Sequence, residues 1–254
     1  VQDRMLELCR KMLNPQGIAF VSYNTYPGAH LRMMIREMML FHTEGCDDPA
    51  EKTRQAGALL DFLQTAAAGD DPYLLLMKKE AERVRNFPPA HLFHDDLAPF
   101  NHPVYFHQFL RHAEKFGLRF LTEADYHETQ DLNFTEEAAH VLKTMEQNPV
   151  IREQYIDFLR CRRFRQTLLC RSDIGLVLGA RAENILDLRV AAQIRPEIGA
   201  DEVSPARSSQ IRFEKAGGGS FVIDLPLFRD ALEWLGRIWP RSIPLTELTE
   251  KGID

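Results

Sequence analysis

The first residues of the chain constrain its fold most, because they combine one amphipathic helix with one isolated buried strand. Apolar residues recur at helical spacing over residues 2–13, residues 14–17 form a turn, and residues 18–21 are an apolar run of strand length. A single strand needs partners for its backbone N–H and C=O groups. The pattern therefore predicts the last helix and strand of an α/β sheet whose earlier strands are absent, and hence a fragment of a larger enzyme.

Helix signals dominate up to about residue 165. Asp48 and Asp71 each precede a proline, which is the favoured order of N-cap and first-turn residue. Asn101 is expected to cap a further helix that ends near Gly117. Three more elements are expected: a strand at 118–122 and helices at about 135–147 and 149–163.

The pattern changes from about residue 186. We expect a strand at 188–194, a loop at 196–209, a β-hairpin at 211–225 with its glycines at the tip, and an amphipathic helix at 227–239. These elements predict a small α+β module, for which a winged-helix-like topology is one candidate.

Several segments resemble one family. LNPQG followed by IAFVSYN is similar to the late helix and strand of class I S-adenosylmethionine-dependent methyltransferases, and residues 22–56 resemble the junction into the methyltransferase regulatory domain of bacterial methyltransferases. Residues 93–124 resemble the closing segment of that domain, and residues 155–174 resemble its link to a following domain. The resemblance covers most of residues 1–175, and some members of this group methylate lysine side chains of proteins.

Together these patterns predict a mainly α fold with an α+β C-terminal module. We divide the chain into four parts: the C-terminal remnant of a methyltransferase α/β domain at 1–27, a helical methyltransferase regulatory domain at 28–130, a helical connector at 131–175 and a small α+β domain at 176–254.

A glycine-rich turn after a strand, which binds the cofactor in class I methyltransferases, is missing near the start of this sequence. Gly217, Gly218 and Gly219 lie between two strand-like runs and suit a hairpin tip. The resemblance implies S-adenosylmethionine as the cofactor of the parent enzyme. We expect this chain alone to bind no cofactor and to be inactive.

Composition narrows the class of protein. No apolar run approaches the ~20 residues of a transmembrane helix, and no signal peptide is visible. The 4 cysteines lack metal or disulfide spacing, which suits a reducing cytosol. A net charge of -6 argues against general nucleic-acid affinity. We expect a cytoplasmic protein with no membrane partner.

The first candidate site comprises Tyr23, Asn24, Tyr26 and Pro27, which directly follow the predicted strand. Open α/β sheets bind their ligands at the carboxyl ends of strands. Aromatic rings and amide oxygens suit a pocket for a methyl acceptor such as a lysine amine, because they stabilise and orient a cation. The alternative is a domain junction that Pro27 rigidifies and the two tyrosines pack. Both interpretations stay open.

The second candidate is a histidine-rich stretch with His94 at its centre. His102, His107 and His112 are five residues apart, so on a helix successive imidazoles rotate by about 140° and do not converge on one ion. We therefore expect no metal site. Instead, His94 and Asn101 are expected to fix their loop to the next helix, with Tyr105 contributing to its core.

The third candidate is the arginine cluster Arg162, Arg163 and Arg165. On one helix Arg162 and Arg165 would be neighbours and could bind an anion, such as an acidic protein substrate or a nucleic acid. The net acidity of the chain favours a solvated face, or pairing with acidic helices of a neighbouring domain.

We predict that the chain is a regulatory or substrate-recognition region of a methyltransferase whose parent methylates a protein side chain such as lysine. Its expected partners are the missing methyltransferase domain, a protein substrate and a second copy of the chain. The alternative is a protein-interaction or dimerisation module without a direct catalytic role. A third hypothesis is a winged-helix DNA binder, suggested by the hairpin and the arginines.

Overall fold

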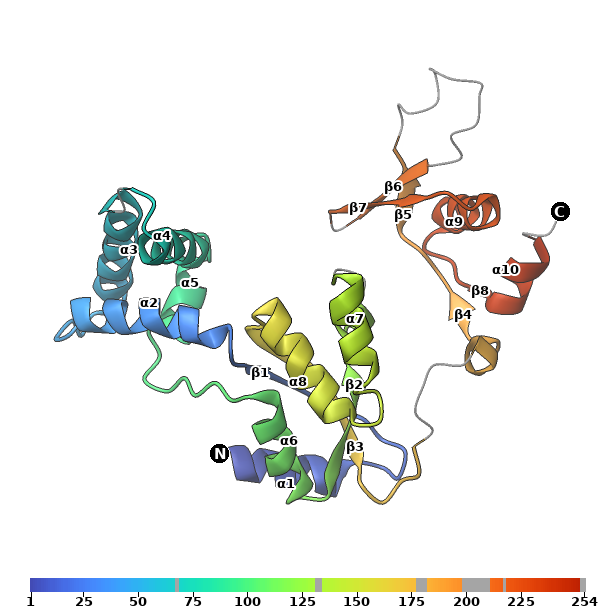
Figure 1. The fold of residues 1–254 in the computed structure, drawn as a ribbon, viewed down its shortest axis with the longest axis horizontal. Helices are drawn as coiled ribbons and strands as arrows, with labels where there is room; N and C mark the ends of the chain where they lie inside the picture. Colours follow the sequence, from blue (N-terminus) through green and yellow to red (C-terminus); the bar gives the residue numbers. More distant parts are fainter. Residues whose placement is uncertain (67–68, 131–133, 177–181, 198–210, 217, 252–254) are drawn as a thin grey trace. The chain divides into compact units, whose positions relative to one another are not determined.

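The computed structural model describes residues 1–66, 69–130, 134–176, 182–197, 211–216 and 218–251. The chain folds into two compact units, residues 1–175 and 176–254, and each is described by itself (Figure 1). Both units combine helices with small antiparallel sheets. The sequence patterns likewise predict both helices and strands.

A three-stranded antiparallel sheet forms the centre of the first unit. β3 (Phe164–Arg171) is the middle strand and pairs with β1 (Ala19–Asn24) on one side and β2 (Leu118–Glu123) on the other. The N-terminal strand therefore has a partner within the chain. Among the described residues, no strand pairs with its second side.

The position of β3 corrects the prediction for the arginine cluster. A helix was expected to run to residue 163, but α8 (Pro149–Arg160) ends at Arg160, where Cys161 adopts a left-handed φ of 48°. That conformation terminates an α-helix. Arg165 lies in β3, so the prediction that Arg162 and Arg165 share one helix face is wrong.

Helices cover one face of this sheet. α1 (Gln2–Met12), α6 (Phe106–Glu114) and α8 lie beside the strands. Along β3 the buried residues Arg165, Thr167 and Leu169 point to this face, and the intervening residues from Phe164 to Leu168 are more exposed. On the opposite face Phe20 and Phe164 are each about half exposed. The apolar core of the covered face is formed by Leu6, Ala19, Phe106, Phe109, Leu110, Ala113, Leu118 and Leu169.

Between β1 and α6 the chain builds a helical subdomain, which occupies one side of the first unit (Figure 1). Its elements are α2 (Ala29–His42), α3 (Pro49–Ala66), α4 (Pro72–Arg85), the short α5 (Pro89–His91) and the π-helical η1 (Leu92–Asp96). They enclose a second core, which we call the helical core: Ile35, Met39, Ala56, Leu60, Leu63, Met77, Ala81, Val84, Leu92 and Leu97.

The helix starts follow the caps expected from the sequence. Asp48 accepts a hydrogen bond from Glu51 N–H at 2.8 Å, and Asp71 accepts one from Leu74 N–H at 3.1 Å. Each bond satisfies an otherwise unpaired donor of the first helical turn. Both predicted N-caps are confirmed.

The predicted cap at Asn101 is wrong. α6 begins after Tyr105, whose backbone N–H donates to Gln108 Oε1 at 3.1 Å in a capping box. The chain cannot enter the helix earlier because Val104 forms a parallel bridge with Thr25. The first unit is completed by the 3-10 helix η2 (Tyr126–Thr129) and by α7 (Glu136–Lys143).

The second unit is a small α+β module. Its three-stranded sheet has the order β5 (Ile194–Pro196), β6 (Ile211–Lys215), β7 (Ser220–Ile223), and α9 (Pro226–Ile238) packs against β5 and β7. The predicted hairpin is confirmed by the β6–β7 pairing. A winged-helix topology stays a prediction, and the expected loop at 196–209 lies almost entirely outside the described residues.

The strand expected at 188–194 is instead two short strands. β4 (Arg189–Val190) pairs with β8 (Ile243–Pro244), whereas β5 joins the other sheet, so different partners divide the segment. The unit also contains the 3-10 helix η3 (Ala182–Ile185) and α10 (Leu245–Lys251). None of the helices described in either unit is both long and apolar enough to cross a membrane.

Candidate functional site

The chain leaves the sheet for the helical subdomain and returns to it at one place, which we call the neck. It comprises residues 24–28, residues 101–105 and the turn at residues 161–163. Val104 N–H donates to Asn24 O and Tyr26 N–H donates to Val104 O, each at 3.2 Å. The buried Thr25 hydroxyl also donates to Val104 O, at 2.8 Å. The outgoing and returning segments are therefore fixed to each other.

The turn at residues 161–163 holds the neck from a third side. Thr25 N–H donates to Arg163 O at 2.9 Å, and Gly28 N–H donates to Arg162 O at 2.8 Å. A Cβ atom at Gly28 would lie 2.6 Å from Arg162 O and closer still to Cys161 O. Only glycine fits here, because the neighbouring atoms belong to the backbone.

The same contacts test whether this turn could hold a cofactor. Turns that bind phosphate or nucleotide groups present free backbone N–H groups to the ligand. Here the N–H groups of Thr25, Tyr26 and Gly28 all donate to carbonyl groups of the chain, and backbone fills the space beside the glycine. The turn after β1 therefore does not fit the phosphate or nucleotide group of a cofactor.

The expectation that Tyr23 and Asn24 follow the strand is wrong, because β1 extends to Asn24 and contains both, and the side chains of the first candidate group are all partly buried. Tyr23 stacks on Phe109 with ring centroids 4.1 Å apart, and its hydroxyl group lies 3.1 Å from Thr167 Oγ1. Burial raises the pKa of Tyr23 above its ordinary value. Tyr26 stacks on His30, with ring centroids also 4.1 Å apart. These contacts describe a packed junction, and a role in acceptor binding stays a prediction.

Asn24, Pro27 and the second candidate group meet at the neck. Asn24 Nδ2 donates to Asn101 Oδ1 at 3.2 Å, and the carbonyl of Pro27 accepts from His30 N–H at 3.0 Å. The Tyr105 ring lies 5.2 Å from that of Tyr26. Two predicted groups thus come together.

The expected role of His94 is not visible in its contacts. Its side chain is exposed, and its ring contacts Phe93 edge to face at a centroid distance of 5.3 Å. It is Asn101 that ties the loop, because Asn101 Nδ2 donates to Asp95 O at 3.4 Å. Within the described parts of the chain, no three histidine, cysteine or acidic side chains are placed to hold a metal ion.

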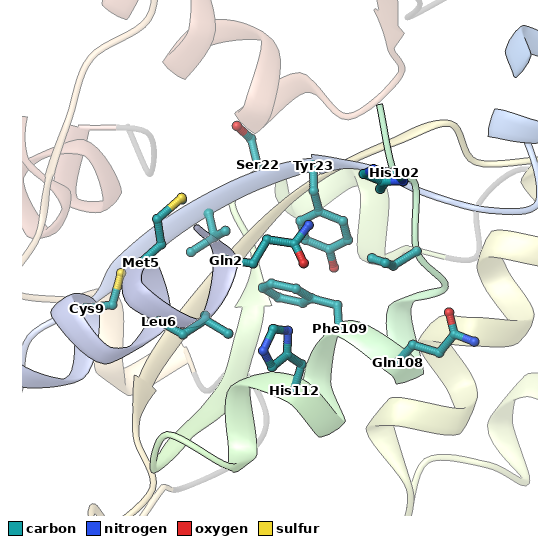
Figure 2. Close-up of a pocket in the computed structure, with 12 residues that line it drawn as sticks. Gln2, Met5, Leu6, Cys9, Ser22, Tyr23, His102, Gln108, Phe109 and His112 are labelled. Carbon is teal, nitrogen blue, oxygen red and sulfur yellow. The ribbon is translucent and has the colours of Figure 1, made fainter. Parts of the chain in front are cut away.

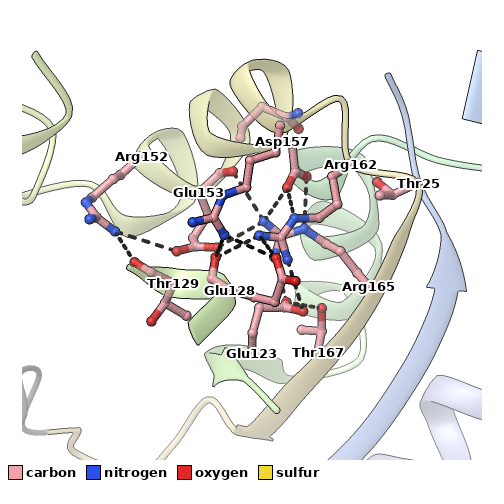
Figure 3. A network of polar contacts seen from close by, with 12 residues as sticks. Thr25, Glu123, Glu128, Thr129, Arg152, Glu153, Asp157, Arg162, Arg165 and Thr167 are labelled. Atoms are coloured by element: carbon pink, nitrogen blue, oxygen red, sulfur yellow. Dashed lines mark hydrogen bonds and ion pairs between the residues drawn. The ribbon is translucent and has the colours of Figure 1, made fainter. Parts of the chain in front are cut away.

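Arg162 and Arg165 of the third candidate group belong to a buried ionic network, which we call the ionic core (Figure 3). Arg165 is fully buried and donates to both carboxylate oxygens of Asp157 at 2.9 Å and to Glu153 Oε2 at 3.0 Å. It also donates to Glu123, and its guanidinium lies 3.7 Å from the centroid of the Phe106 ring. One cation thus joins α8, β2 and α6 to β3.

The other two arginines are also paired inside the chain. Arg162 lies 2.7 Å from Asp157 Oδ1 and 3.0 Å from Glu128 Oε2, and Arg163 pairs with Glu80 of α4. An external anion would therefore meet guanidinium groups that already neutralise carboxylates of the protein. An anion-binding role for the cluster stays a prediction without support from these contacts.

Burial also changes the titration of the ionic core. Removal of Asp157 from water raises its pKa to about 6, although the hydrogen bonds and charge of Arg165 act in the opposite direction. Thr167 extends the network toward the neck, because its hydroxyl donates to Glu123 at 2.7 Å and lies beside Tyr23. Sequence reasoning missed these carboxylates, since they come from separate elements and form no motif.

Two recesses flank the neck. The first, which we call the apolar recess, has a volume of about 250 Å³ and lies between α1, β1 and α6. Figure 2 shows the rings of Tyr23 and Phe109 inside it. The second, the polar recess, has a volume of about 240 Å³ and is lined by Asn24, His94, Asp95, Phe100, Asn101 and His102. His102 lines both recesses.

Comparison with known proteins identifies relatives of this arrangement. Residues 88–171 match the family model described as "Predicted methyltransferase regulatory domain", which overlaps the predicted regulatory domain and connector. The chain is 32% identical over 199 residues to the uncharacterized protein RP789 of Rickettsia prowazekii, covering 78% of this chain and 36% of that protein. It is 40% identical over 116 residues to the uncharacterized protein RP028 of the same organism, covering 45% of this chain and 46% of that protein.

Solved structures with the same fold include PKMT2 from Rickettsia typhi, at 30% identity and a TM-score of 0.82, with 99% of this chain and 48% of that chain covered. The structure of PKMT2 in complex with AdoHcy matches equally well and is covered to 49%. This chain thus spans about half the length of the solved structures that it matches, and less than half the length of the curated relatives. It contains a segment similar to the methyltransferase regulatory domain and, over nearly its whole length, is similar to part of PKMT2.

Proposed function

We propose that this chain is the acceptor-recognition and regulatory region of an S-adenosylmethionine-dependent methyltransferase that modifies a protein side chain such as lysine. The observation that carries the proposal is the neck. It places Asn24, the last residue of β1, in the lining of the polar recess together with Asn101 and His102 of the returning segment, and Tyr26 follows two residues later. The match to PKMT2, a protein lysine methyltransferase whose structure is known with AdoHcy, supports the reaction class.

In this proposal the cofactor is held by parts of the parent protein beyond these residues. Two observations support a methyltransferase domain as the partner. The second side of β1 has no strand partner among the described residues. Met5, Met12 and Phe20, on α1 and β1, are more than half exposed, which leaves apolar surface beside that edge. A neighbouring domain that adds a strand would satisfy the open backbone groups.

A second candidate function is a protein-interaction or dimerisation module. One observation favours it: Ile151, Tyr155, Phe158 and Leu159 form an exposed apolar stripe along α8. Light scattering of the parent protein and of a Tyr155→Ser/Phe158→Ser variant tests this function. A dimer that the double variant splits would support it, whereas a monomer in both proteins would exclude self-association through this stripe.

Calorimetric titration of S-adenosylmethionine and AdoHcy tests whether the cofactor site lies outside residues 1–254. We expect binding to the parent protein and none to residues 1–254 alone. Binding by this chain alone would contradict the proposal, because the cofactor site would then lie within it.

Methyl transfer to a lysine peptide by the parent protein tests the acceptor role. Asn24→Ala should lower turnover at least about tenfold through misplaced acceptor geometry, with unchanged AdoHcy affinity. Phe41→Ala, at a side chain that is 80% exposed on α2, is the matched control. Unchanged turnover in Asn24→Ala would leave the neck with a structural role only.

A further inference from the structure

We propose that the polar recess binds the ammonium group of the acceptor lysine, an assignment that rests on the proposed function for the identity of its ligand. An ammonium group carries three hydrogen-bond donors and no acceptor. A site for it must therefore present an excess of acceptors, and the orientation of the side chains in the recess provides this excess.

The two amide side chains are oriented by a backbone carbonyl. Asp95 O can only accept, so Asn101 must turn its Nδ2 toward it, at 3.4 Å. Asn101 Oδ1 is then left facing Asn24, which must donate through its own Nδ2, at 3.2 Å. This relay leaves Asn24 Oδ1 as an acceptor, and no donor from the described residues reaches it. Reversing either amide would oppose two acceptors.

Asp95 supplies negative charge to the same recess. Its Oδ2 lies 3.0 Å from His91 Nε2, while Oδ1 receives no donor from the part of the chain that the structure describes. The nearby cation Arg32 forms two hydrogen bonds with the buried Asp96, at 2.6 and 2.9 Å. Its Nη2 also lies 3.2 Å from His91 Nε2, and its charge attracts Asp95 without a hydrogen bond between the two side chains. Asp95 Oδ1 therefore remains available to an added cation.

An aromatic side chain completes the recess at its rim. Phe100 is 79% exposed, and its ring centroid lies 6.4 Å from that of His102. So large an exposed ring contributes little to the fold, but the face of an aromatic ring attracts a cation. The stem of a lysine could lie along Phe100 while its ammonium group reaches Asn24 and Asp95.

Two other recesses of the first unit suit a cation less well. The apolar recess contains no carboxylate side chain in its lining. The recess beside α3 and α4 contains the cations Arg54 and Arg85, and its carboxylate, Asp61, already pairs with Arg85 at 2.8 Å. The polar recess combines an unpaired acceptor, a carboxylate and an exposed ring.

The test measures binding of two peptides to the parent protein. One is a pentapeptide with a central lysine, and the other carries norleucine, which keeps the apolar stem and lacks the amine. We expect a preference for lysine that falls about fivefold in Asp95→Asn and about threefold in Phe100→Leu. The matched controls are Asp47→Asn, at an exposed aspartate outside the recess, and Phe41→Leu. Both should keep the preference.

An unchanged lysine preference in both recess variants would overturn the assignment. Phe100→Leu guards against misfolding as an explanation, because it alters an exposed ring. Binding and methyl transfer separate the two proposals. Methyl transfer without a recess-dependent preference would contradict this inference alone. A recess-dependent preference without methyl transfer would support the cation site and contradict the proposed function.

Discussion

The two cores of the first unit are built on opposite principles. The helical core consists of aliphatic and methionine side chains and excludes water through non-directional burial. The ionic core instead buries Arg165 with Asp157, Glu123 and Glu153. A core of the first kind tolerates changes of shape that conserve volume. A core of the second kind depends on charge balance, because an unpaired buried ion is strongly unfavourable.

The largest expected effect comes from removing the central cation. Arg165→Leu leaves three buried carboxylates with less compensation, so the free energy of unfolding should fall by about 3–5 kcal/mol. Urea denaturation of the chain measures this change. Arg4→Leu, which removes an exposed partner of Glu7, is the control and should change stability by less than about 0.5 kcal/mol. A loss in Arg165→Leu as small as in the control would show that the ionic core is solvated.

The helical core should respond to lost volume instead of lost charge. Leu60→Ala removes a fully buried side chain and should lower the free energy of unfolding by about 3 kcal/mol, through lost burial and a residual cavity. Its effect should not depend on pH. Leu76→Ala, at an exposed position of α4, is the control. Equal losses from the two variants would contradict the assigned packing of this subdomain.

A pH series should distinguish the two cores directly. The pKa of Asp157 is raised by burial from 3.8 to about 6, so the folded state binds this proton more tightly than the unfolded state. The contribution of Asp157 to stability is therefore greatest below about pH 4 and is lost as the pH rises to about 6. Relative to Asp157→Asn, the native chain should lose roughly 2–3 kcal/mol across this window.

Denaturation of both proteins at several pH values measures that difference. Parallel profiles for the native chain and Asp157→Asn would contradict the raised pKa. Leu60→Ala serves as a second reference, because its profile should keep the shape of the native one.

The neck, which joins the two cores, should show the smallest effect on stability. Gly28→Ala places a Cβ atom against Cys161 O and Arg162 O and should lower stability by about 2 kcal/mol, because the backbone must shift. Gly175→Ala is the control, since no atom lies within 4 Å of a Cβ at that position. A neutral Gly28→Ala would mean that the three segments of the neck separate easily.

The sequence predicted the helical subdomain better than the sheet, and β3 shows why. Two of its buried positions hold the polar residues Arg165 and Thr167. Phe164, its first residue, is apolar but about half exposed. A hydrophobic pattern cannot reveal a strand whose inward side chains are polar. Asp48 and Asp71 were predictable because capping depends on local contacts alone.

The candidate site was predictable only in part for the same reason. Asn24 and Asn101 were each singled out, yet their hydrogen bond joins residues far apart in sequence, and only the folded neck brings them together. The partners of Arg162 and Arg165 come from β2, η2 and α8. No spacing in the sequence predicts that these carboxylates pair with the two arginines, because each carboxylate alone resembles an ordinary surface residue.

The neck also makes the helical subdomain exchangeable. Since the chain departs and returns at adjoining points, residues 29–100 form a closed loop whose ends are fixed by the sheet. The entropy of closing such a loop grows only slowly with its length. None of the three strands lies within the loop, so a longer, shorter or wholly different set of helices leaves their register unchanged. A lineage can thus alter what this subdomain contacts while it keeps one sheet.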